Sequence, residues 1–203
     1  MSQDSMGAMR PCPRQTKRCT VSAQPLIRRF GYDVRPIASG SRSIRETLGE
    51  CYEHLNASGF KPGTLVDVGV ATGTPELYEA FPKAHFLLVE ALKAFEGDLK
   101  RILQRYQGNY VLAAAGPAAG EVTFNVHSHQ LDGSSLYKET MGSVADGEEV
   151  TVPQVRIDDV VKEHGCPGPY LIKIDIQGAE LDALDGATEI LGDTEVIVLE
   201  VSL

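Results

Sequence analysis

Short apolar runs that alternate with amphipathic segments are the feature that most constrains how this chain folds. The runs are rich in Val, Ile and Leu along their length, as strands are when both faces of a sheet are covered. Segments with a helical period separate them. This order predicts an α/β domain with a doubly wound, mostly parallel sheet. The predicted strands are 64–70, 85–91, 109–116, 170–176 and 195–202, and the predicted helices after the first strand are 75–81, 93–106, 158–164 and 179–191.

Another helix is predicted before the first strand. Ser43 and Glu46 have the spacing of a capping box, in which each side chain bonds a backbone N–H at the start of the helix. Apolar residues then recur at helical spacing as far as Leu55, and Gly59 occupies a C-cap position. We therefore expect a helix from Ser43 to about Gly59.

The middle of the chain has a different pattern. Residues 121–128 and 149–157 alternate apolar and polar side chains, which is typical of strands with one exposed face. The polar sequence between them is rich in Gly and Ser, and loops of that length are usually functional or disordered. We expect an insertion of two strands that carries a mobile loop.

Charge is divided unevenly along the 203 residues. Residues 1–45 hold 9 of the 19 Lys and Arg residues but only Asp4 and Asp33 as acids, so this part is +7 and the rest is −16. We interpret residues 1–42 as a flexible basic leader and residues 43–203 as the folded domain. The acidic domain argues against nucleic-acid binding, which needs a basic face.

Two other classes of protein are also disfavoured. No apolar run approaches the roughly 18 residues that would span a bilayer, and no signal peptide precedes the four cysteines. The cysteines have no metal-ligand spacing, so no zinc site is predicted. No residue is assigned to a metal, since a divalent cation between Asp175 and Glu180 would have two carboxylates without a visible third ligand. We expect reduced thiols and a cytoplasmic protein that does not bind membranes.

A ligand site is expected beyond the carboxyl ends of the parallel strands. The first strand runs into VDVGVATGT, in which Gly69 and Gly73 permit a tight turn, and Pro75 opens the next helix. Glu90 ends the second strand, where an acidic side chain accepts hydrogen bonds from the two hydroxyls of an adenosine ribose. Loop and carboxylate together favour a ligand that contains adenosine, either NAD or S-adenosylmethionine.

Charged residues also stand inside the apolar stretch YLIKIDIQGAELDALDGA. The strand 170–176 should lie beside the strand 64–70, so Asp67 and Asp175 should face one crevice. A buried carboxylate costs several kcal/mol unless it is hydrogen-bonded or ion-paired. Lys173 is close enough in sequence to pair with Asp175, and that pairing is the structural alternative to a functional role.

Several motifs, in order, resemble the FkbM family of S-adenosylmethionine-dependent methyltransferases. LIKIDIQGAELDALDGA resembles its Lys-x-Asp-x-Glu-Gly-x-Glu motif, while LVDVGVATGTPELYEAF and FLLVEA resemble its glycine motif and acidic strand end. DGSSL and VPQVRIDDVV resemble two further family segments. The resemblance covers residues 64–202, although Gln177 stands where the family has Glu. It implies a Rossmann-like class I methyltransferase fold, of which the last two strands are not apparent in this sequence.

The resemblance also implies the reaction and its residues. The reaction would be O-methylation of a hydroxyl group on a small molecule or glycan, such as a sugar or a polyketide-type metabolite. Asp175 would contact the acceptor hydroxyl as base or as orienting acceptor, with Glu180 as its companion; His127 and His129 are alternative bases. The residues expected to bind S-adenosylmethionine are Asp67, Gly69, Thr72, Gly73, Glu90, Ser134 and Ser135.

Two other functions stay open at this stage. A non-catalytic or degenerate adenosine-binding module would keep the cofactor side and lose the acceptor side. A nicotinamide-dependent oxidoreductase is disfavoured because neither GxGxxG nor Tyr-x-x-x-Lys is present. The apolar strand 195–202 would form an exposed sheet edge, so association of copies through it is expected.

Overall fold

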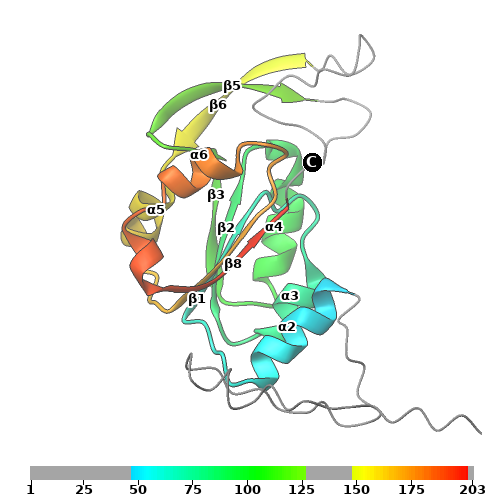
Figure 1. Ribbon diagram of the computed structural model, residues 1–203. Helices are drawn as coiled ribbons and strands as arrows, with labels where there is room; N and C mark the ends of the chain where they lie inside the picture. The colour runs from blue at the N-terminus through cyan, green and yellow to red at the C-terminus, as the bar shows by residue number, and fades with distance from the viewer. Residues whose placement is uncertain (1–46, 127–147, 201–203) are drawn as a thin grey trace, which may run out of the picture. The chain divides into compact units, whose positions relative to one another are not determined.

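A parallel five-stranded sheet forms the centre of the computed structural model, which describes residues 47–126 and 148–200 (Figure 1). The strand order is β3-β2-β1-β7-β8, and every neighbouring pair is parallel. The sequence therefore predicted the α/β class and the parallel sheet correctly. The strands are β1 (Thr64–Val68), β2 (His85–Glu90), β3 (Gly108–Leu112), β7 (Tyr170–Ile174) and β8 (Thr194–Leu199).

Helices cover both faces of the sheet, because each buried strand sends alternate side chains to opposite sides. The helices α2, α3 and α4 lie on one side of the sheet, and α5 and α6 lie on the other (Figure 1). Leu65, Phe86 and Leu171 belong to the core under the first three helices, and Val66, Leu87 and Ile172 belong to the core under the other two. The helices are α2 (Leu48–Ala57), α3 (Pro75–Ala80), α4 (Glu96–Leu103), α5 (Ile157–Glu163) and α6 (Glu180–Asp185), with short 3-10 turns η1 (Lys93–Phe95) and η3 (Ile190–Asp193).

A second, three-stranded sheet contains the predicted insertion. Its order is β4-β6-β5, with β4 (Ala114–Ala115), β5 (Gly120–Val126) and β6 (Glu148–Val155). The strands β5 and β6 form an antiparallel pair, as their alternating sequence predicted. The predicted loop between them and the basic leader, residues 1–42, lie outside the described residues.

Several predicted boundaries were wrong. The strands predicted over 64–70, 85–91 and 170–176 end at Val68, Glu90 and Ile174, and the helix predicted over 93–106 is the turn η1 followed by α4, which ends at Leu103. The helix α2 begins at Leu48, because Thr47 has extended backbone angles and its side chain accepts a hydrogen bond from the Glu50 N–H. The predicted capping box of Ser43 and Glu46 lies outside the described residues. The strand predicted over 109–116 is divided, since β3 ends at Leu112 and the chain joins β6 of the other sheet at Ala114.

The helix predicted over 179–191 is also shorter, because Gly186 follows α6. A β-carbon at Gly186 would lie 2.1 Å from the carbonyl oxygen of Gly116. This close approach joins the end of α6 to the connection that leads from β4 to β5. Only the turn η3 then precedes β8.

The strand β8 is an edge of the main sheet. Val196 and Val198 pack inward against the core, while Ile197 and Leu199 are 43% and 36% exposed. Among residues 47–126 and 148–200, no strand pairs with the outer side of β8. None of the helices described in those ranges has the length and apolar character to cross a membrane.

We predict that copies of the chain associate through β8, because an unpaired strand with apolar side chains is a template for another strand. Replacement of Ile197 by Lys should reduce the association, measured by size-exclusion chromatography with light scattering over a concentration series. Leu181→Lys is the matched control, since Leu181 is 74% exposed but lies on α6. A wild-type chain that stays monomeric throughout the series would contradict the prediction.

Candidate functional site

A cavity of about 230 Å³ lies beyond the carboxyl ends of β1, β2 and β7. The strand order reverses between β1 and β7, and such a reversal is where open α/β sheets bind ligands. The loop after β1 forms one wall, and small residues of β4 and Phe124 of β5 form another. The lining residues are Val68, Gly69, Val70, Ala71, Thr72, Gly73, Thr74, Val89, Ala91, Ala113, Ala114, Ala115, Phe124, Lys173, Asp175 and Ile176.

The two strand ends that build the cavity approach each other closely at Gly69. This residue has a φ of +76°, and a β-carbon there would lie only 1.9 Å from the carbonyl oxygen of Asp175. Glycine is therefore required by the packing of β1 against β7 as well as by the turn. The strands β1 and β7 are adjacent, as expected, but the expectation that Asp67 and Asp175 face one crevice holds only for Asp175, because Asp67 is fully buried and is not among the lining residues.

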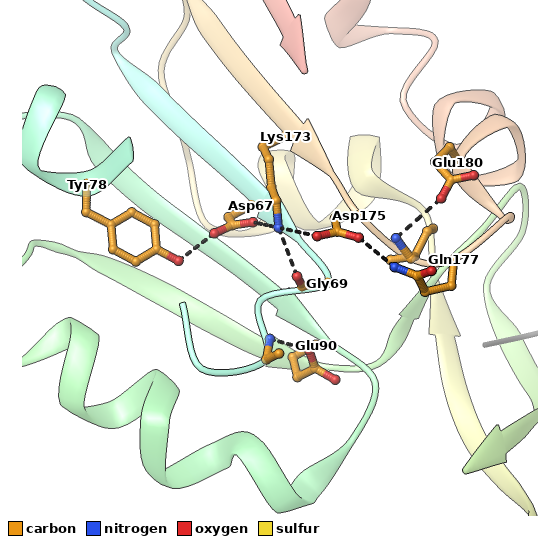
Figure 2. Close-up of polar contacts among 10 residues, drawn as sticks. Asp67, Gly69, Tyr78, Glu90, Lys173, Asp175, Gln177 and Glu180 are labelled. Atoms are coloured by element: carbon orange, nitrogen blue, oxygen red, sulfur yellow. Dashed lines mark hydrogen bonds and ion pairs between the residues drawn. The ribbon is translucent and has the colours of Figure 1, made fainter. Parts of the chain in front are cut away.

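Lys173 is the centre of the charged residues at the site. Its side chain is nearly buried, and its Nζ lies 3.2 Å from Asp67 Oδ1 and 3.6 Å from Asp175 Oδ2 (Figure 2). The same ammonium group donates a hydrogen bond of 3.1 Å to the carbonyl oxygen of Gly69. Three acceptors thus surround a group with three N–H bonds. The Lys173 Nζ therefore contacts groups from the end of β1, from the glycine loop and from the residue after β7.

Asp67 is fully buried and does not line the cavity. Its Oδ2 accepts a hydrogen bond from the Tyr78 hydroxyl, and its Oδ1 contacts Lys173 as an ion pair without a well-aligned hydrogen bond (Figure 2). Burial raises the pKa of Asp67, and the positive charge of Lys173 and the Tyr78 hydrogen bond oppose that rise. Asp67 contacts Lys173, and Lys173 in turn lines the cavity.

Glu90 holds the glycine loop against the end of β2. Its carboxylate accepts hydrogen bonds from the backbone N–H of Ala71 at 2.9 Å and of Leu92 at 2.8 Å. Ala71 has a φ of +45°, which is uncommon for a residue other than glycine, and the bond to Glu90 compensates for this conformation. Burial raises the pKa of Glu90, and these backbone hydrogen bonds counteract the rise.

The turn from β7 to α6 fixes Asp175 in place. Asp175 is 28% exposed at the cavity, and its Oδ1 accepts a hydrogen bond of 3.0 Å from the Gln177 side chain. Gln177 also has a left-handed backbone, with a φ of +54°. Glu180 is buried and accepts a hydrogen bond of 2.9 Å from the Gly178 N–H, so its carboxylate faces the turn and not the cavity (Figure 2).

The structure thus sorts the residues predicted from sequence into four groups. Gly69, Thr72, Gly73 and Asp175 line the cavity. Asp67 and Glu90 are buried behind it, where they support Lys173 and the loop, and Glu180 supports the turn after β7. The remaining candidates lie outside the described residues; they are His127, His129, Ser134 and Ser135.

Sequence reasoning did not identify Lys173 or Phe124 as residues of the cavity. Lys173 was considered only as a partner of Asp175, although its spacing of two from Asp175 on one strand placed both on the same face. Phe124 gave no local signal, because nothing in an alternating strand indicates which loop it will contact. Among the described residues, no group of three or more His, Cys, Asp or Glu side chains is placed to hold a metal ion.

The parallel sheet, the glycine loop and the cavity at the strand reversal define a Rossmann-like fold of the methyltransferase type. The family description "Methyltransferase FkbM domain" matches residues 67–203, which is more than half of the chain. The chain therefore belongs to the FkbM methyltransferase family. Comparisons with curated proteins and with solved structures find no match.

Two buried tyrosines near Asp67 should differ in how loss of the hydroxyl changes the free energy of unfolding. Tyr78→Phe leaves Asp67 Oδ2 without its donor and should lower the free energy of unfolding by about 1–3 kcal/mol. The Tyr52 hydroxyl is buried without a hydrogen-bond partner among the described residues, and burial raises the pKa of Tyr52 to about 12. Tyr52→Phe should leave stability unchanged or raise it, because it removes an unpaired polar group.

Urea unfolding of both variants and the wild type measures this difference. Each substitution removes one oxygen atom and keeps the ring, so packing losses are matched. Equal destabilisation by the two variants would contradict the assignment of Tyr78 as the donor to Asp67.

Proposed function

We propose that this methyltransferase uses S-adenosylmethionine and methylates a hydroxyl group of a small-molecule or glycan acceptor, such as a sugar or a polyketide-type metabolite. The observation that carries the proposal is the cavity itself. It brings the glycine loop, the end of the Glu90 strand and the Asp175 carboxylate to one place.

The residues in and around the cavity include groups that suit an adenosine cofactor. Glu90 is buried behind the loop that lines the cavity, and backbone N–H groups of Val70, Ala71 and Leu92 bond its carboxylate. At most one of its about four acceptor positions is then open to a ribose hydroxyl, so its main part in cofactor binding would be to hold the loop in place. The neighbouring wall contains Val89, Ala91 and Phe124, which offer an apolar surface and an aromatic ring to a purine.

The methionine end of the cofactor would lie along the loop Gly69–Thr74. Its residues are small or present backbone groups, so the chain can approach a ligand closely. When bound, the cofactor supplies a methyl group on a positively charged sulfur, which is already activated for attack by an oxygen nucleophile. The protein then has to position two reactants and to accept one proton.

The position of Asp175 suits its carboxylate to accept the proton of the acceptor hydroxyl. Its carboxylate is exposed to the cavity, while Gln177 and Lys173 fix its orientation from behind. An acceptor hydroxyl that donates a hydrogen bond to Asp175 would be directed toward the donor side of the cavity. Glu180 has no comparable access, since the turn occupies its carboxylate.

Calorimetric titration with S-adenosylmethionine, S-adenosylhomocysteine and NAD tests the proposal. We expect micromolar binding of the two sulfur nucleosides, no comparable binding of NAD, and loss of binding in Glu90→Ala. Asp175→Asn is the matched control, and its affinity for the cofactor should stay within a few fold of wild type because Asp175 faces the acceptor.

The fold of each variant is checked by circular dichroism before titration. A folded wild-type chain that binds none of the three ligands would contradict the proposed function and favour a degenerate member of the family. Loss of binding in Asp175→Asn would instead place this residue in the donor site.

A further inference from the structure

The strand β8 continues beside the catalytic candidate Asp175. Ile174 pairs with Leu199 in the parallel ladder of β7 and β8, and the N–H of Glu200 donates a hydrogen bond of 3.1 Å to the carbonyl oxygen of Ile174. The ladder therefore extends one residue past β8. Glu200 stands on the neighbouring chain segment next to Asp175, which lines the cavity.

The side chains of these two residues also meet. Their adjacent places on the two strands bring the Glu200 carboxyl group within hydrogen-bonding reach of the Asp175 carboxylate. The negative charge of Asp175 is the main cause that raises the pKa of Glu200, followed by this hydrogen bond and by desolvation. Two carboxyl groups can hydrogen-bond to each other only when one of them carries a proton.

The other charged groups near the pair come from β1, β7 and α6. Lys173 lowers the pKa of Glu200 and Glu180 raises it, and both effects are smaller than that of Asp175. Lys173 is already shared between Asp67 and Asp175. Its single positive charge faces two carboxylates before Glu200 is counted, so a proton on Glu200 relieves the excess of negative charge.

We propose that Asp175, which lines the cavity, and Glu200 form a proton-sharing carboxyl pair, in which Glu200 is a positioning residue for Asp175. The pair is argued from the adjacent places of Asp175 and Glu200 at the ends of β7 and β8 and from their charges, without reference to any ligand. Its use in methyl transfer rests on the proposed function.

In that use, the new oxygen–carbon bond forms as the carbon–sulfur bond breaks, and the bonding electrons stay on sulfur. The hydroxyl proton passes to Asp175. Glu200, which is exposed to solvent, releases its own proton to water, and the proton on Asp175 then moves along the shared hydrogen bond to restore the starting state. One proton leaves per methyl group transferred.

A carbon-13 NMR titration of the full chain labelled at glutamate carboxyl carbons tests the pair directly. Glu200→Gln assigns the signal. In the wild type we expect the Glu200 midpoint to lie above the ordinary glutamate value of about 4.3. In Asp175→Asn the midpoint should return toward that value, because the neighbouring charge and the shared proton are lost. Glu195→Gln, on the same strand, is the control that should leave the Glu200 midpoint unchanged.

The same titration with saturating S-adenosylmethionine or S-adenosylhomocysteine tests separately whether the carboxyl pair exists and whether it lies beside the methyl donor. The sulfonium is positively charged and the thioether is neutral, so only the former should lower the Glu200 midpoint. A Glu200 midpoint at the ordinary value in the wild type would overturn the pair. A raised midpoint that falls in Asp175→Asn, but does not distinguish the two nucleosides, would confirm the pair and contradict its place beside the methyl donor.

Discussion

The buried ammonium group of Lys173 is the interaction on which the rest of the site depends. Removing a charge from water costs several kcal/mol unless opposite charges and hydrogen bonds replace the solvent. Asp67 of β1, the Gly69 carbonyl of the loop and Asp175 after β7 supply those replacements. The strands β1 and β7 are thereby held at the register that creates the cavity.

Polar side chains around this centre stabilise backbone conformations that would otherwise be unfavourable. Glu90 bonds the left-handed Ala71, Gln177 is itself left-handed and bonds Asp175, and Glu180 accepts the N–H of Gly178. Each of these contacts orders a turn at a strand end. The cavity is therefore arranged before a ligand enters, which reduces the cost of ordering it on binding.

The sequence predicted the parts of this arrangement that depend on local patterns. Fully apolar strands indicated a parallel sheet, and the position of Asp67 and Asp175 at two adjacent strand ends followed from topology. The partners of each side chain could not be predicted in the same way. The bond of Glu90 to Ala71 and the contact of Glu200 with Asp175 depend on how distant segments pack, which no local period encodes.

The measurement that tests the central role of Lys173 most directly is a double-mutant cycle in urea unfolding with Lys173→Met and Asp67→Asn. Lys173→Met leaves the Asp67 charge buried without its cation and should cost about 3–5 kcal/mol. Asp67→Asn in that background should recover part of the loss, with a coupling free energy between about 0.5 and 3 kcal/mol. Additive effects of the two substitutions would contradict the account, because they would show that the ion pair does not hold the strand ends together.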